Sequence, residues 1–284
     1  YPFESMEVNT SGIHELIVTR IAKDGFYVTD LAGQASGYNH MFAFSFSTPR
    51  GMRVCDRVTY LSGTVVEFFG FTELSFPSFE VEPLFAGQEE FCKVPEPVVL
   101  SPDTINSAAA MESLESALVR VEGFRIPRNF GPLPALNNVF AENQSNCDLN
   151  GDGRVDFNNA AEAACGNACS SDRECVEWTG YAGRGNYKVY KEEVDEMGAT
   201  TIVVMQVQTD GAPAFDPTQH NGRTRATGTG TMRRFSGGSL NWTGEARCPD
   251  DVVCGFPGCS EAVKSPKEAC VSLRTEDDND AGTN

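Results

Sequence analysis

The residues whose types and spacing best suit chemistry lie between Asp148 and Asn159, in the run DLNGDGRVDFNN. Oxygen-bearing side chains recur at short intervals along this run, and Gly153 allows a sharp turn between them. Calcium takes about six to eight hard oxygen ligands, and this spacing wraps oxygen ligands around one point. The sequence therefore predicts a Ca²⁺ site whose ligands are Asp148, Asn150, Asp152, the backbone carbonyl of Arg154, Asp156 and Asn159.

This run resembles the loop of EF-hand proteins, and more closely the loop of dockerin modules. Its carboxylates and amides fall at loop positions 1, 3, 5 and 9, with Gly153 at the turn position 6 and Arg154 at position 7. Position 12 is Asn159, which offers one oxygen where an EF-hand has a bidentate Glu, so that Glu162 or a water would complete the shell. The paired second loop of that family is missing. The alternative is a polar turn without an ion; for a bound ion we expect a structural role, because the loop lies in a Cys-rich insert.

Ten cysteines indicate an oxidising compartment and hence an exported protein. They fall into groups of two, four and four: Cys55 and Cys92; Cys147, Cys165, Cys169 and Cys175; Cys248, Cys254, Cys259 and Cys270. We expect Cys55–Cys92 to cross-link the first module. In the second group, Cys147–Cys165 would brace the calcium loop and Cys169–Cys175 would close a small turn. The last four allow three pairings, between which the sequence does not choose. A zinc site would require CxxC pairs or nearby histidines, and the sequence has neither.

The chain of 284 residues is strongly acidic, with 22 basic and 40 acidic side chains and a net charge of −18. Residues 1–97 carry 6 basic and 13 acidic side chains, residues 98–190 carry 7 and 12, and residues 191–284 carry 9 and 15. Phosphate contacts require Lys and Arg, so that nucleic acid is disfavoured as a partner of any third of the chain. The acidity instead serves solubility or the binding of cations.

Short apolar runs separated by turns predict an all-β protein. Residues 13–30 predict a β-hairpin around the turn Lys23-Asp24-Gly25, and residues 41–47, with Phe at every second position, predict a half-buried strand. Residues 51–85 form a long β stretch broken by Gly63 and Gly70, where we expect a bulge or a barrel corner. About five short, curved strands within about 80 residues are typical of a small closed barrel.

A second β pattern follows a proline-spaced linker at residues 94–101. Asp103 or Thr104 would cap a short helix that runs through Ala110. The β pattern begins at residues 117–124 and resumes at 188–190, 201–208, 225–234 and 239–247. The polar, Cys-rich stretch at about 128–186 interrupts it and is too long for a plain loop, so that we interpret it as a functional insert.

Three stretches together, DGFYVTD, CDRVTYLSGTVVEFFGFTEL and MESLESALVRVEGF, resemble tandem OB-fold modules. Such modules occur beside extracellular nucleases of the endonuclease/exonuclease/phosphatase type and in surface lipoproteins of Gram-negative bacteria. The run FSGGSLNWTGEARCPDDVVC resembles the closing strand and Cys-rich end of these lipoproteins. The resemblance covers about residues 10–125 and, less closely, 188–247. It implies a first OB-like barrel at residues 1–97, a second at 98–247 with a calcium- and disulfide-containing insert at about 128–186, and a Cys-rich acidic tail at 248–284. It implies no nuclease activity, because the catalytic domain of those enzymes is absent from the sequence.

No arrangement of residues in the sequence predicts an enzyme. His14, His40 and His220 are far apart and match no metal-binding spacing, so that each is interpreted as a surface residue. GxSxG and P-loop motifs are absent, and carboxylate pairs such as Glu192-Glu193 indicate a solvated face. Aromatic residues at 68, 69, 71 and 76 are either ordinary barrel core or a face that stacks on bases or sugars.

The sequence therefore predicts a non-enzymatic extracellular or cell-surface protein, stabilised by calcium and disulfides, that mediates protein–protein assembly, in a filament or surface layer, or adhesion. Its predicted partners are other protein subunits and glycans. The alternatives are an OB-fold module that binds oligosaccharide or single-stranded nucleic acid, and an accessory domain of a secreted nuclease. No apolar run is long enough to span a membrane, and the opening Tyr1-Pro2 is interpreted as the start of a trimmed exported chain, with a lipid anchor possible upstream. An ordered acidic end at residues 274–284 would indicate packing against a neighbour.

Overall fold

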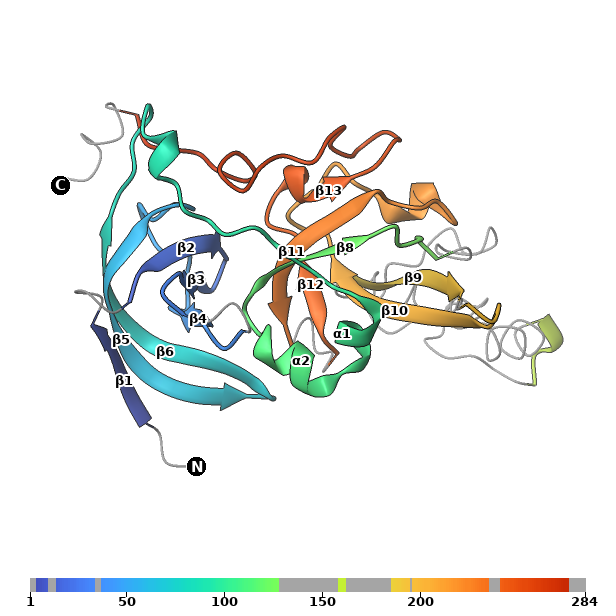
Figure 1. Cartoon of the computed structure of the whole chain (residues 1–284), viewed down its shortest axis with the longest axis horizontal. Coiled ribbons are helices and arrows are strands. Elements are labelled where there is room, and N and C mark those ends of the chain that lie inside the picture. Colours follow the sequence, from blue (N-terminus) through green and yellow to red (C-terminus); the bar gives the residue numbers. More distant parts are fainter. Residues whose placement is uncertain are drawn as a thin grey trace.

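The protein is mostly β, with two mixed sheets side by side (Figure 1). The computed structural model describes the backbone of residues 4–9 and, with their side chains, residues 14–33, 37–127, 158–161, 185–194, 196–234 and 241–275. Among the described helices, none has the length and apolar character needed to cross a membrane.

The first sheet closes into a ring of five strands. Its strands are β1 (Glu4–Asn9), β2 (Leu16–Ile21), β3 (Gly25–Asp30), β4 (His40–Phe44), β5 (Arg57–Phe68) and β6 (Phe71–Glu82). They lie in the order β1-β5-β2-β3-β4-β6, and β5 pairs with β6 as well, which closes the ring from β2 to β6. β4 and β6 run parallel, whereas the other pairs are antiparallel. β1 lies outside the ring on β5.

The predicted hairpin is confirmed, with β2 and β3 antiparallel on either side of the turn at Lys23-Asp24. Gly25 follows this turn because the strands approach closely there: a Cβ on Gly25 would lie 2.1 Å from the carbonyl oxygen of Ala43. The predicted bulge at Gly63 is also present. Thr64 pairs with Ser75 and Ser62 with Ser78, so that Gly63 faces two residues of β6 instead of one. Gly70 instead belongs to the turn between β5 and β6.

The second sheet repeats the connectivity of the first. Its strands are β7 (Val98–Val99), β8 (Leu118–Glu122), β9 (Asn186–Val194), β10 (Thr200–Gln208), β11 (Thr227–Arg233), β12 (Thr243–Glu245) and β13 (Val252–Val253). They lie in the order β7-β8-β11-β12-β10-β9, with β13 beside β11. Counting from β2 and from β8, the third and fifth strands are parallel in both sheets. A bridge between Arg125 and Tyr190 joins the chain after β8 to β9, the far end of the path.

The linker and the short helix differ in part from expectation. The predicted linker contains β7, which pairs in parallel with β8. Two helices follow it, α1 (Pro102–Asn106) and α2 (Ala108–Ser113). The predicted caps, Asp103 and Thr104, are wrong: Ser101 and Ser107 have extended backbone and accept hydrogen bonds from Thr104 N at 3.1 Å and Ala110 N at 3.3 Å. Serine is the N-cap because its hydroxyl reaches the free N–H groups of the first turn. Pro102 suits the first helical position.

Three short 3-10 helices complete the described elements: η1 (Glu89–Phe91), η2 (Pro217–His220) and η3 (Pro249–Asp251).

Alternate residues of a strand pack in different hydrophobic clusters. In β2, Leu16 and Val18 pack in the core of the first ring, whereas Ile17 packs in a cluster with Cys55 and Cys92. This follows from the period of two along a strand.

The C-terminal segment crosses from the second sheet back to the first. Val271 and Leu273 pack on the cluster around Cys55 and Cys92. Arg274 then donates hydrogen bonds from Nη1 and Nη2 to the carboxylate of Asp56 at 2.6 and 2.7 Å, in a buried ion pair. The end that the sequence assigns to a separate tail therefore ties the two sheets together, and residues 276–284 lie outside the described residues.

Three disulfides lie in the described part of the chain: Cys55–Cys92, Cys248–Cys270 and Cys254–Cys259. The first is the pair expected for the first module. The other two resolve the choice that the sequence left open for the last four cysteines, and the cysteines at 147, 165, 169 and 175 lie outside the described residues. Three disulfides indicate an oxidising environment.

Candidate functional site

The predicted calcium ligands lie almost wholly outside the described residues. Asp148, Asn150, Asp152, Arg154 and Asp156 all do, and the calcium site stays a prediction. Asn159 is described, and its Oδ1 accepts a hydrogen bond from Ala161 N at 3.0 Å. Within the described ranges, one group of three metal-capable side chains occurs, Cys248, Asp251 and Cys270. It suits no metal, because its two cysteines form a disulfide and Arg247 holds the carboxylate.

A cleft of about 480 Å³ lies between the two sheets. One wall is the end of β2 with the β2–β3 turn, and the other is formed by the ends of β10, β11 and β12. Its charged lining residues are Arg20, Lys23, Asp24, Asp210, Arg233, Glu245 and Arg247. Its volume falls within the range of small-molecule sites, about 300–1,000 Å³.

The cleft charges are paired across the junction. Arg20 of the first ring donates to Glu245 of the second sheet at 2.6 Å, and to Thr231 at 2.6 Å. Burial alone would lower the pKa of Arg20, but the Glu245 carboxylate outweighs burial and raises it above its usual range. Arg233 approaches Asp24 at 3.3 Å. Both ion pairs therefore also hold the two sheets together.

Two donors have no hydrogen-bond partner within the described residues, one on Arg233, which lines the cleft, and one on Tyr27, whose ring centroid lies 5.3 Å from the guanidinium of the cleft residue Arg20. They are the hydroxyl of Tyr27, a wholly buried side chain, and Nε of Arg233. Burial, followed by the negative charge of Glu245, raises the pKa of Tyr27 to about 12, so that its hydroxyl remains a donor. Buried donors without acceptors are rare in native proteins, which makes these two atoms candidates for contact with a bound molecule.

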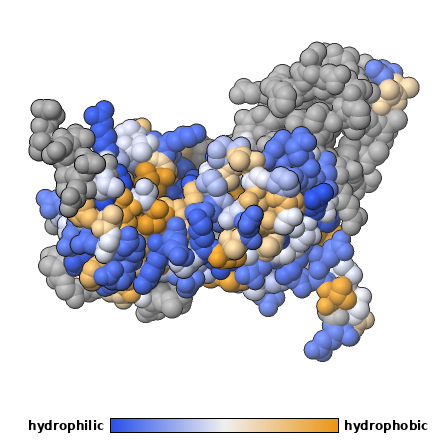
Figure 2. All heavy atoms as spheres, turned by 90° about the horizontal axis from the view of Figure 1, so that it is seen from above, coloured by the Kyte–Doolittle hydropathy of each residue, from blue (hydrophilic) through white to orange (hydrophobic). Residues whose placement is uncertain are grey.

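Aromatic side chains form an exposed row on the first ring. The phenylalanine row consists of Phe44, Phe46 and Phe76, with ring centroids 4.4 Å apart for the first pair and 5.2 Å for the second. Phe46 is 62% exposed and Phe76 is 73% exposed. On the face seen in Figure 2, hydrophobic side chains are gathered in patches among hydrophilic ones.

The interpretation of positions 68, 69, 71 and 76 as barrel core is therefore wrong for all but Phe71, which is fully buried. The bulge opposite Gly63 turns Phe76 outward, and Phe68 and Phe69 lie at the tip of the β5–β6 turn. Backbone φ is positive at Phe46, Phe69 and Phe76, and at the exposed Tyr38. Large side chains rarely adopt this region, and such strain concentrates at functional sites.

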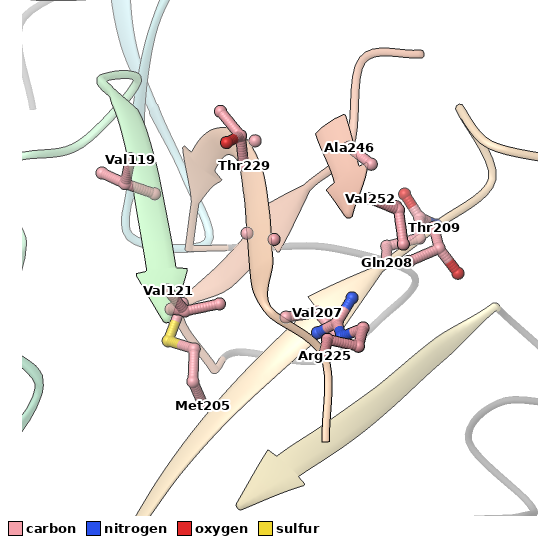
Figure 3. A pocket seen from close by; sticks show the side chains of 13 residues that line it. Val119, Val121, Met205, Val207, Gln208, Thr209, Arg225, Thr229, Ala246 and Val252 are labelled. Atoms are coloured by element: carbon pink, nitrogen blue, oxygen red, sulfur yellow. The ribbon is translucent and has the colours of Figure 1, made fainter. Parts of the chain in front are cut away.

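A separate pocket lies inside the second sheet, between β8, β10 and β11 (Figure 3). It is lined by apolar side chains, including Val119, Val121, Met205 and Val207, and Arg225 lies among them. Arg225 is 2% exposed. Arg225 is not among the site residues predicted from the sequence. A signal was present in the run TGTGT of β11, because Gly228 and Gly230 face the same side and leave space there.

The histidines are separate from one another, as expected, but two are not surface residues. His14 is exposed and bonds Asp30 at 2.5 Å. His40 is half-buried against Thr29 at 2.8 Å, and burial lowers its pKa to about 4. His220 is half-buried against the ring of Phe256, with centroids 4.3 Å apart.

Comparison of the chain with protein-family models, with curated proteins and with solved structures gives no match in any of the three. The resemblance to OB-fold modules of nuclease-associated proteins and surface lipoproteins therefore stays a prediction.

Proposed function

We propose that this chain is a non-enzymatic extracellular or cell-surface protein that assembles with other protein subunits. The phenylalanine row carries this proposal. Two of its rings, those of Phe46 and Phe76, are exposed on a backbone with positive φ, although a smaller or polar residue would cost less at both positions. Exposed aromatic clusters mark protein–protein contacts, where aromatic side chains contribute most of the binding energy.

The finer fold assignment, a pair of OB-like barrels, belongs to the same proposal. It is supported by the five-strand order that both sheets share, with the third and fifth strands parallel. Tandem barrels that are joined by ion pairs, and that each contain disulfides, form a rigid platform for a docking surface. The predicted calcium ion would add rigidity in the insert between β8 and β9.

The partner surface that fits best is apolar at its centre and neutral or basic around it. The phenylalanine row supplies aromatic area but no charge, and the whole chain carries a net charge of −18. Two acidic surfaces repel each other at low salt, which favours a different subunit over a second copy of this chain.

The assembly state of the protein as isolated from its natural source tests the proposal. Light scattering and chemical cross-linking, with and without calcium, should detect a complex larger than one chain. A monodisperse monomer under both conditions would contradict the proposal, and a complex of this chain alone would assign the partner as a second copy.

Two variants then locate the contact. The double variant Phe46→Ser/Phe76→Ser should dissociate the complex while the purified chain keeps its melting temperature, because both side chains are mostly exposed. Phe91→Ser is the matched control, since Phe91 is 57% exposed but lies in η1, outside the row. If both variants dissociate the complex equally, the phenylalanine row is not part of the interface.

The inter-sheet cleft favours a second candidate function, the binding of a neutral oligosaccharide. Its ion pairs leave little net charge, whereas its arginines and carboxylates offer both donors and acceptors. Sugar hydroxyls both donate and accept hydrogen bonds. A sugar hydroxyl would accept hydrogen bonds from the Tyr27 hydroxyl and from Nε of Arg233.

Tyr27→Phe tests this candidate. The variant loses the partnerless hydroxyl, so that the free protein should be at least as stable, while affinity for a binding neutral trisaccharide should fall by about tenfold or more. Tyr60→Phe is the control, because the Tyr60 hydroxyl bonds Ser62 on β5, away from the cleft lining. Absence of binding across a panel of neutral trisaccharides would reject this function.

A further inference from the structure

Arg225 is a buried cation without an acidic partner in the described part of the chain. Arg225 lies just before β11 in the chain, and its side chain is almost completely buried. Nε and Nη2 have no hydrogen-bond partner there, and no ion pair involves Arg225 among the described residues. An arginine keeps its positive charge in proteins, and a buried charge without compensation is strongly unfavourable.

The other buried arginines show how this chain normally compensates such a charge. Arg247 donates Nε and Nη2 to Asp251 at 2.9 and 2.8 Å. Arg20 is held by Glu245, and Arg274 by Asp56. Arg225 therefore departs from a pattern that the molecule follows three times.

The two partnerless nitrogens form one binding edge. Nε–H and one N–H of Nη2 point the same way from the planar guanidinium. This edge can therefore donate two hydrogen bonds to a single acceptor. In Arg247 the same edge holds a carboxylate. Arg225 itself lines the pocket, and its guanidinium lies beside Val207 (Figure 3).

The size of the pocket selects the acceptor. The free volume for a water-sized sphere is about 10 Å³, roughly what one water molecule needs. A carboxylate or phosphate is too large for this space, whereas a single-atom anion is closer to it in size. A neutral water would fill the space but leave the charge uncompensated.

The surroundings favour the guanidinium cation. The guanidinium lies 6.0 Å from the ring centroid of Tyr187 and 5.9 Å from that of Phe215. Gly228 has no side chain, and a Cβ there would lie 3.3 Å from Nη1. The remaining lining is largely apolar and has low polarisability, which strengthens an ion pair formed inside it.

We propose that the pocket inside the second sheet binds one halide ion, chloride in the natural medium, through Nε and Nη2 of Arg225. The ion is a structural component that completes the core of the second sheet, and this site is separate from the phenylalanine row and from the cleft.

Thermal unfolding of the unaltered protein in sodium chloride and in sodium gluconate, at matched sodium concentration, is the first test. Chloride should raise the melting temperature. Well above the dissociation constant, each tenfold rise in chloride should raise the ratio of folded to unfolded protein about tenfold. Identical melting temperatures in the two salts would overturn the proposal.

Bromide provides the direct test, because its anomalous X-ray scattering marks its position. Crystals of the unaltered protein grown in sodium bromide should show an anomalous peak beside Nε and Nη2 of Arg225. Density there without an anomalous signal identifies water and overturns the proposal. This result does not depend on the folding of any variant.

Arg225→Met should remove the chloride dependence of the melting temperature. Arg120→Met is the matched control, because Arg120 lies on the neighbouring β8, is half-buried and bonds Thr229 at 3.3 Å. The control should keep the full chloride dependence. If both variants keep it, the effect of chloride arises elsewhere and the assignment to Arg225 is wrong.

Discussion

Arg247 and Asp251 form a two-pronged ion pair that is almost completely buried, with the two side chains 2% and 1% exposed. Nε and Nη2 of the arginine meet the two carboxylate oxygens at 2.9 and 2.8 Å, and Nη1 reaches the carbonyl oxygen of Thr19 in the first ring at 3.2 Å. The pair therefore links the Cys248–Cys270 region to the contact between the sheets.

Asp251→Asn should lower the free energy of unfolding by about 3–5 kcal/mol, because it leaves the guanidinium buried without its counter-ion. Urea denaturation measures this loss. Glu82→Gln is the control, since the pair Arg57–Glu82 is 48% and 61% exposed and should contribute at most about 1 kcal/mol. Similar losses for the two variants would mean that burial does not determine the strength of these pairs.

Phe69→Asn should raise the free energy of unfolding by about 0.5–1 kcal/mol. Phe69 and Gly70 form the two-residue turn between β5 and β6, with φ values of 51° and 77°. Hairpin turns with two positive φ values favour Asn-Gly, because asparagine tolerates this region and phenylalanine does not. A rise in thermal stability together with weaker assembly would indicate that Phe69 is retained for binding. A fall in stability would show that its contact with Phe68 outweighs the strain.

The stability of the protein should depend on Glu115 between about pH 4.5 and 7. Burial raises the pKa of Glu115 to about 7, although its carboxylate accepts a hydrogen bond from Thr72 N at 2.9 Å. The folded state then binds the proton more tightly than the unfolded state, so that this contribution is complete below about pH 4.5 and is lost as the pH rises through 7.

Glu115→Gln should therefore flatten the fall in melting temperature across this range. Glu122→Gln serves as the control, because Glu122 is exposed at the end of β8 and should leave the pH profile unchanged. An unchanged profile for Glu115→Gln would mean that other groups cause the fall.

The predicted calcium loop should bind Ca²⁺, and Asp152→Ala should abolish that binding in a calorimetric titration. Asn159→Asp should tighten it, because a carboxylate can offer two oxygens where the amide offers one. Glu142→Ala is the control, since Glu142 is an acidic residue of the same insert outside the loop. A chain that binds no calcium would leave the loop as a polar turn.

The features that the sequence predicted correctly depend on residues close together in the chain. The hairpin at β2 and β3 follows from an apolar run, an Asp-Gly turn and a second apolar run. The bulge at Gly63 follows from a glycine inside a strand. The helix caps were missed, although they are local, because Ser101, Asp103 and Thr104 are all residue types that cap helices, and only the backbone angles decide between them.

The features that the sequence did not predict depend on distant residues. Arg20 and Glu245 are 225 residues apart, and Arg274 and Asp56 are 218 apart. Nothing in the local pattern around either arginine indicates which carboxylate it will meet. The outward turn of Phe76 likewise follows from strand pairing across the sheet.

The β class, the oxidising environment and the grouping of the cysteines could be predicted from the sequence, because composition, alternation and turn residues act locally. The tertiary structure decided which cysteines of the C-terminal group pair, which phenylalanines are exposed, and which arginine is left without a carboxylate. These outcomes are set by packing and burial, and burial is a property of the whole folded chain, not of any short segment of it.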